Sequence, residues 1–232
     1  MTIASRELKS YFVSPVAYAV GFFFLLILGA WFYFITVSSQ HVADLTGTFN
    51  VLGYLCIPVA AVITMHLFSE ERRSGTIELL MTYPLSDWEV VLGKYLASLV
   101  LYLFVLVLTL QFPIFLGIFG LPDWGSILAG YIGCFLLGAA FLAMGVLASA
   151  LTRSAVVAAI ICLLVLFGFR FMEAGRMMVG SLGRIFYYLS FAEQFRNFTS
   201  GLIDTRDMVY LGSFVLFTLF TAVRVVEINR WK

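Results

Sequence analysis

The side chains most able to do chemistry in this chain crowd between positions 68 and 94. The stretch FSEERRSGTIELLMTYPLSDWEVVLGK is densely charged, although charged residues make up only 12% of the sequence. Its eight charged residues are Glu70, Glu71, Arg72, Arg73, Glu78, Asp87, Glu89 and Lys94. Burying eight charges at the centre of a bilayer would cost about 20 kcal/mol or more, at roughly 2.5 to 3.5 kcal/mol each. We therefore expect the whole segment to lie in water.

Residue types that could catalyse a reaction or bind a metal are scattered along the chain. The sequence has no phosphate-binding GxxxxGK[ST] loop and no HExxH motif. Its two histidines, His41 and His66, are far apart, and its three cysteines lie in separate apolar runs without CxxC spacing. We predict no catalytic residue, no metal site and no cofactor bound by this chain.

The elements that must position the charged segment are membrane helices. Apolar residues make up 62% of the chain and the mean hydropathy is +1.02, whereas an average soluble domain is about 45 to 50% apolar. A helix needs about 20 mainly apolar residues to cross a bilayer. Six apolar runs approach that length, at 16–37, 50–68, 95–118, 126–151, 155–172 and 208–226. We predict one all-α, polytopic membrane domain over residues 1–232, with six transmembrane helices.

The distribution of lysine and arginine predicts which side each connection faces. An even number of spans places both termini on one side, and nine of the 14 basic residues fall on that side. Because basic residues concentrate in cytoplasmic loops, we expect both termini in the cytoplasm. The net charge of +1 gives no indication of a nucleic-acid partner.

Polar residues are rare within the predicted spans. Aspartate and glutamate are missing from every span core, and a proton-coupled carrier usually needs such carboxylates. Gln111, two residues before Pro113 in the third span, is the main polar residue that we expect to be buried. It fits a hydrogen bond between helices best, and a polar position in a transport pathway is the alternative.

Two amphipathic segments flank the predicted spans. At the N-terminus, ASRELKSYF places apolar and polar side chains on opposite helical faces, which is typical of a helix lying in the headgroup plane. Before the last span, an apolar stripe recurs at i, i+4, i+7 and i+11, at Phe191, Phe195, Phe198 and Leu202. This stripe predicts a short external helix, re-entrant or interfacial, which Gly201 can end.

The charged segment itself has an ordered pattern. Residues 76–81 can form a short amphipathic helix, and Pro84 prevents its continuation. Ser86 and Glu89 then have the spacing of a capping box that opens the third span. The pattern predicts a stiff elbow with an apolar surface, which is typical of a docking element.

This combination resembles the ABC-2-type permeases of bacterial ABC exporters. The segment FSEERRSGTIELLMTYPLSDWEVVLGKYL is similar to that family's ERxxGTxExLLxxP pattern and to the xxxxxVxGK that follows it. The segments RELKSYFVSPVAYAV and FRNFTSGLIDTRDMVYL are similar to a subgroup that includes gliding-motility-associated and multicopper-enzyme-maturation permeases. The resemblance covers nearly the whole chain.

The resemblance implies the ABC-2 exporter fold and a permease subunit without its own nucleotide site. Such a subunit lies among the lipids of the bacterial inner membrane and works as a dimer with cytoplasmic ATPase subunits, which bind ATP and magnesium. It also implies an accessory subunit with a periplasmic domain and external helices that close the outward end of the pathway. The elbow would be the coupling helix, and its contacts with the ATPase would come from Glu70, Glu71, Arg72, Gly75, Thr76, Glu78 and Leu79.

Two other functions stay open at this point. The first is a membrane anchor or scaffold of an ABC-like complex, for example in gliding or envelope machinery, because the same coupling could transmit force without moving a solute. The second is a secondary carrier, which the missing intramembrane carboxylates disfavour. The apolar spans do not predict the cargo.

Overall fold

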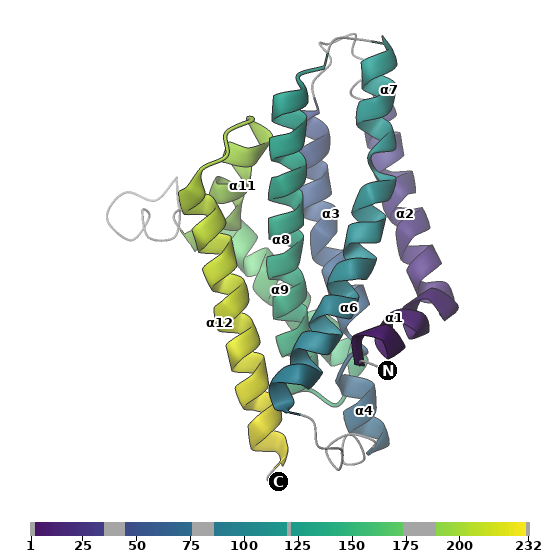
Figure 1. Ribbon diagram of the computed structural model, residues 1–232, viewed down its shortest axis with the longest axis vertical. Helices are drawn as coiled ribbons and strands as arrows, with labels where there is room; N and C mark the ends of the chain where they lie inside the picture. Colours follow the sequence, from purple (N-terminus) through teal and green to yellow (C-terminus); the bar gives the residue numbers. More distant parts are fainter. Residues whose placement is uncertain (1–2, 35–44, 76–85, 120–121, 174–188, 231–232) are drawn as a thin grey trace.

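The computed structural model describes residues 3–34, 45–75, 86–119, 122–173 and 189–230, and these residues form helices without a strand. Figure 1 shows the helices as a bundle with its long axis vertical. In chain order they are α1 (Ile3–Val13), α2 (Pro15–Phe32), α3 (Thr46–Thr64), α4 (Ser69–Ser74), α6 (Asp87–Leu108), α7 (Gln111–Phe119), α8 (Trp124–Leu151), α9 (Ala155–Phe171), α11 (Phe191–Thr199) and α12 (Thr205–Arg230). The predicted all-α class is confirmed for the described part of the chain.

Several of these helices are long and apolar enough to cross a membrane. Four segments qualify alone, at Thr46–Ser74, Asp87–Ile118, Trp124–Leu151 and Thr205–Ile228, and the bent pair α1 and α2 raises the total to five. The predicted fifth span corresponds to α9, whose 17 residues reach about 25 Å at 1.5 Å per residue. The chain is therefore a multi-pass membrane protein, and the number six stays a prediction.

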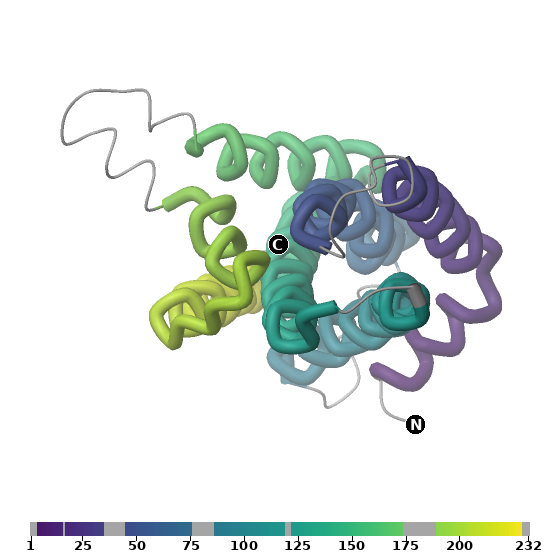
Figure 2. The backbone as a smooth tube through the Cα atoms, turned by 90° about the horizontal axis from the view of Figure 1, so that it is seen from above, coloured from purple at the N-terminus to yellow at the C-terminus, as the bar shows by residue number. Residues whose placement is uncertain are grey.

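Helix α8 lies at the centre of the bundle, with α3, α6, α9 and α12 around it (Figure 2). Small residues of α8 let its neighbours approach closely. Side chains from other elements lie directly on four of its glycines, where an added Cβ would come within 2.0 to 2.4 Å of them. The pairs are Gly130 with Phe49, Gly133 with Phe198, Gly138 with Tyr102, and Gly145 with Thr64.

Hydrogen bonds from three tyrosine hydroxyls join α8 to the α6–α7 segment. Each donates a hydrogen bond to a backbone carbonyl of the opposite element. The pairs are Tyr95 with Ala139, Tyr102 with Cys134, and Tyr131 with Thr109, at 3.2, 2.8 and 2.9 Å. A buried tyrosine hydroxyl needs such a partner, and these bonds make α6 and α8 one packed unit.

The third predicted span corresponds to the segment Asp87–Ile118, which has an irregular turn between α6 and α7. Pro113 has no N–H to donate to the carbonyl of Thr109, and the hydroxyl of Tyr131 donates to that carbonyl instead. Gln111 begins α7 and its side chain is exposed on the described chain. The expectation that Gln111 is the main buried polar residue is therefore wrong, because Gln111 lies on the exposed side of the segment that also carries Phe104 and Val107.

The amphipathic N-terminal helix is confirmed as α1, which meets α2 at a bend of 67°. Tyr11 and Phe12 pack against the bundle, whereas Arg6, Lys9 and Ser10 are exposed. Figure 1 shows α1, α4 and the C-terminal end of α12 toward the same end of the bundle, with α7 and α11 toward the other. Both ends of the described chain thus lie toward the same end of the bundle.

Candidate functional site

The first half of the charged segment forms α4, a short helix that follows α3 after a turn. Two carboxylates lie in its first turn and two arginines in its last turn, an order that complements the helix dipole. Gly75 follows with a φ of 71°, a left-handed conformation that suits glycine at the end of a helix. The local sequence thus specifies a charged helix that ends at Gly75.

Lys94, in the second turn of α6, is the one lysine or arginine that is buried in the described part of the chain, with 1% of its side chain exposed. Its ammonium donates to the Leu67 carbonyl at 2.7 Å, to Glu71 Oε1 at 2.9 Å and to Glu7 Oε1 at 3.2 Å. A lysine has three N–H donors, so all three are used. The expectation that every charge of the segment lies in water is wrong for Lys94, because two carboxylates neutralise it.

A second cation completes a four-residue ion cluster, which consists of Arg6, Glu7, Glu71 and Lys94. Arg6 Nη2 lies 3.1 Å from Glu7 Oε1 and 3.6 Å from Glu71 Oε1. The side chains of Glu7 and Glu71 are 16% and 18% exposed, so their pairing with Lys94 is shielded from water. The cluster has no net charge and joins α1, α4 and α6.

Helix α4 is also attached to the end of α8. The first N–H groups of a helix have no partner within that helix, and the residue before α4, Phe68, makes no side-chain cap. Ser149 Oγ accepts from the N–H groups of Phe68 and Ser69 at 3.0 and 3.3 Å. Arg72 Nη1 donates to the Ala150 carbonyl at 2.5 Å. Side chains and backbone of two helices therefore fix the position of α4.

The remaining charged side chains of α4 face away from the bundle. Glu70 is 65% exposed and its carboxylate lies 2.6 Å from His66 Nδ1, and Arg73 is exposed. Of the residues predicted to contact an ATPase, Glu70 and Gly75 thus lie on the surface, whereas Glu71 and Arg72 make the inward contacts described above. Thr76, Glu78 and Leu79 lie outside the described residues.

The capping box that opens the next helix is confirmed. Ser86 Oγ accepts from the N–H of Glu89 at 3.3 Å, and Glu89 Oε2 accepts from the N–H of Ser86 at 2.9 Å. This reciprocal pair fixes the start of α6 at Asp87. It also places Lys94 two turns into the helix, level with α4.

At the opposite end of the bundle, the predicted aromatic stripe forms α11. Phe191, Phe195 and Phe198 are each at most 1% exposed, whereas Leu202, which follows the helix, is 65% exposed. Gly201 has a φ of 82° and ends the segment as expected. The short helix is confirmed, and it is packed against α8 and α3; its role as a gate stays a prediction.

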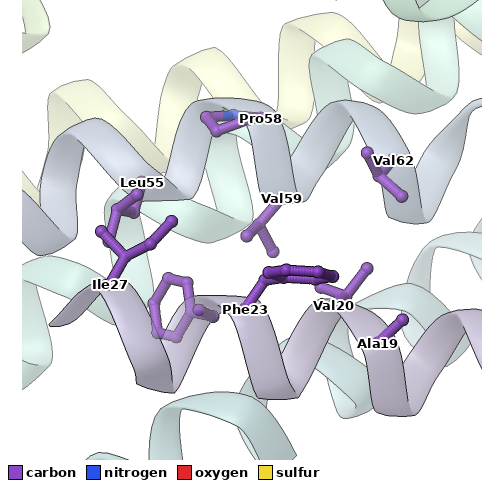
Figure 3. Close-up of a pocket in the computed structure, with 9 residues that line it drawn as sticks. Ala19, Val20, Phe23, Ile27, Leu55, Pro58, Val59 and Val62 are labelled. Carbon is purple, nitrogen blue, oxygen red and sulfur yellow. The ribbon is translucent and has the colours of Figure 1, made fainter. Parts of the chain in front are cut away.

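An apolar groove of about 370 Å³ lies between α2 and α3. In Figure 3, Phe23 and Ile27 of α2 face Leu55, Pro58 and Val59 of α3 across it. Its lining offers aliphatic and aromatic contacts. Within the described residues, no three His, Cys, Asp or Glu side chains are grouped to hold a metal ion.

Comparison with known proteins shows which family this chain belongs to. Residues 1–202 match the model of the ABC-2 family transporter proteins. The chain belongs to this family. A search of curated proteins found no match to the sequence of this chain. An ABC-2 permease is a membrane component without an ATP-binding site, and the family implies association with an ABC ATPase.

Sequence reasoning missed three contributors to this ABC-2 site, namely the burial of Lys94 and the roles of Glu7 and Ser149. Glu7 is 87 positions from Lys94, and Ser149 is 80 positions from Ser69, so no local spacing connects them. One signal was available, because a lysine that follows the apolar pair Val90 and Val91 near the start of an apolar helix needs a counter-ion.

Proposed function

We propose that this ABC-2 family protein is the permease subunit of an ATP-driven ABC exporter in the inner membrane of a bacterium. Separate ATPase subunits on the cytoplasmic side bind ATP and magnesium, and they dock on α4. The observation that carries the proposal is the two-sided arrangement of α4. Its outward face presents Glu70 and Arg73, and its inward face is fixed to α1, α6 and α8 through Glu71 and Arg72.

The outward and inward faces of α4 have different roles in coupling. Exposed charges can recognise a partner and steer its approach, whereas a buried, fully hydrogen-bonded charge fixes geometry. Glu70, Arg73 and Gly75 therefore contact the ATPase, together with Thr76, Glu78 and Leu79 farther along the elbow. Glu71 and Arg72 pass the displacement of α4 to the membrane helices.

Further parts of the proposal follow the family resemblance. Six spans place both termini in the cytoplasm, beside α4, and α11 lies at the periplasmic end. There Phe191, Phe195, Phe198 and Leu202 close the outward end of the pathway. The working unit is a dimer of permease subunits in membrane lipid, and an accessory subunit supplies a periplasmic domain, as in the gliding-motility and multicopper-enzyme-maturation subgroup.

The docking face can be tested by co-purification with an ABC ATPase from the same bacterium. The variant Glu70→Gln with Arg73→Gln removes one charge of each sign from the outward face. Because truncating charges at an interface reduces affinity, we expect ATPase binding at least about tenfold weaker, or about 1.4 kcal/mol. The matched control is Arg224→Gln with Glu227→Gln, an exposed ion pair toward the C-terminal end of α12.

Both variants should insert into the membrane like the wild type, since neither changes a buried residue. Wild-type binding by the α4 variant would overturn the assignment of α4 as the docking helix. Export is tested separately, in vesicles that hold the permease and its ATPase and are supplied with ATP and labelled lipid or peptide. ATP-dependent movement of α4 without movement of any cargo would instead indicate a complex that transmits force.

A further inference from the structure

We propose that Lys94 is the positioning residue that makes α1, α4 and α6 move as one body. Its three acceptors belong to three different parts of the chain, which are α1, α4 and the turn that precedes α4. Lys94 itself belongs to α6. The inference deepens the proposed function, and its first measurement does not depend on an ATPase.

The chemistry of the ammonium group explains why it can act as a joint. Each of its three N–H donors has one acceptor, and the ring of Phe68 lies 5.1 Å from Nζ as a further favourable contact. If α4 moved away alone, it would take the Glu71 carboxylate with it. The buried ammonium of Lys94 would then lose one of its two carboxylate partners, which is strongly unfavourable. The lowest-energy response to a force on α4 is therefore for α1 and α6 to follow it.

A purely stabilising role accounts for this cluster less well. Apolar residues of similar volume often replace a buried ion pair without loss of stability, and the surrounding sequence of α6 is apolar. In addition, α1 already has an attachment that does not use the cluster, because the hydroxyl of Tyr11 donates to the Ile63 carbonyl at 2.8 Å. What the cluster adds is a direct connection from α4 to α1.

The first measurement uses the isolated chain in lipid nanodiscs. Spin labels on Lys9→Cys in α1 and Arg73→Cys in α4 report the distance between the two helices, and both positions are exposed. The natural cysteines are buried, so they should not take the label. We expect one narrow distance distribution in the otherwise wild-type chain.

The test variant is Glu7→Gln with Glu71→Gln and Lys94→Met, which removes the shielded charges together. Arg6 loses both carboxylates, but its side chain is 56% exposed and water can solvate its charge. We expect this variant to fold and to lose the single narrow distance, because α4 can then move separately from α1. The control variant is Arg224→Gln with Glu227→Gln, which removes the exposed ion pair of α12. It should keep the single narrow distance distribution. An unchanged narrow distribution in the folded test variant would overturn the inference.

A milder variant covers the case in which the triple change prevents folding. Glu71→Gln leaves Lys94 with its bonds to Glu7 and to the Leu67 carbonyl and removes the one carboxylate that α4 contributes to the ion cluster. It should also broaden the distance between labels on α1 and α4. A distribution as narrow as that of the wild type would contradict the role of Lys94.

The second measurement uses the complex with the ATPase and tests transmission itself. Labels on Lys9→Cys in α1 and Phe22→Cys in α2, which are both exposed positions, report movement of α1 relative to α2. ATP should shift this distance in the wild type and leave it unshifted in the triple variant, although both bind the ATPase. If ATP moves α1 equally in both, the inference fails. If no ATPase binds the wild type, the proposed function fails and the first measurement still decides the inference.

Discussion

The contact between Gly138 of α8 and Tyr102 of α6 gives a demanding test of the packing. A Cβ at position 138 would lie 2.2 Å from two carbons of the tyrosine ring, whereas ordinary contact begins at 3.4 Å. The ring would have to withdraw by the difference, which is 3.4 − 2.2 = 1.2 Å. It is held in place by the bond from its hydroxyl to the Cys134 carbonyl at 2.8 Å and by contact with Cys56 Sγ at 3.1 Å.

Gly138→Ala should therefore destabilise the bundle. Overpacking of this kind costs about 1 to 3 kcal/mol, and weakening the tyrosine hydrogen bond adds roughly 1 kcal/mol. Replacing glycine by alanine within a helix gains about 1 kcal/mol, which offsets the second term. We expect a net loss of about 1 to 3 kcal/mol in the free energy of unfolding.

The assay is equilibrium unfolding in mixed micelles, followed by circular dichroism. Gly168→Ala in α9 is the matched control, since a Cβ there meets nothing within 4 Å, and it should be neutral or slightly stabilising. Adding Tyr102→Leu to Gly138→Ala should reduce the loss caused by the alanine, relative to Tyr102→Leu alone. Equal stability of Gly138→Ala and Gly168→Ala would refute the close approach of α6 and α8.

Two further predictions concern single polar groups. Tyr131→Phe removes the hydroxyl that donates to the Thr109 carbonyl and should lower the free energy of unfolding by about 1 kcal/mol; micelle unfolding would measure this, and no loss would contradict the bond. Hydrogen bonds from the Ser126 hydroxyl and the Gly125 N–H lower the pKa of Asp123, so its contribution is present at neutral pH and is lost as pH falls through the lowered pKa. The protection of amides at the start of α8 against hydrogen exchange, measured relative to their intrinsic exchange rates, should fall at acid pH in the wild type and fall less in Asp123→Asn; an equal fall would contradict this role.

Local patterns in the sequence predicted local structure well. The capping box of Ser86 and Glu89, the helix end at Gly201 and the aromatic stripe of α11 each depend on residues a few positions apart. Backbone geometry within one or two turns determines such features, so one sequence is enough to find them. The amphipathic character of α1 was predictable for the same reason.

Features that depend on distant residues were not predictable in this way. The burial of Lys94 requires a carboxylate from α1 and another from α4, and the chain must fold before these partners meet. Gln111 shows the converse error, since a polar residue in an apolar run suggested burial. It lies on the exposed side of the segment, together with Phe104 and Val107.

The polar contacts of the described residues also indicate how a displacement of α4 can reach other helices. The ion cluster joins α4 to α6, and the three tyrosine bonds join the α6–α7 segment to α8. Helix α2 is packed differently, because apolar side chains meet α3 across the groove shown in Figure 3. Apolar contacts are not directional, so sliding along them costs less than breaking a buried charge-assisted bond. A displacement of α4 should therefore carry α6 and α8 with it, and the yielding contact should be the one between α2 and α3.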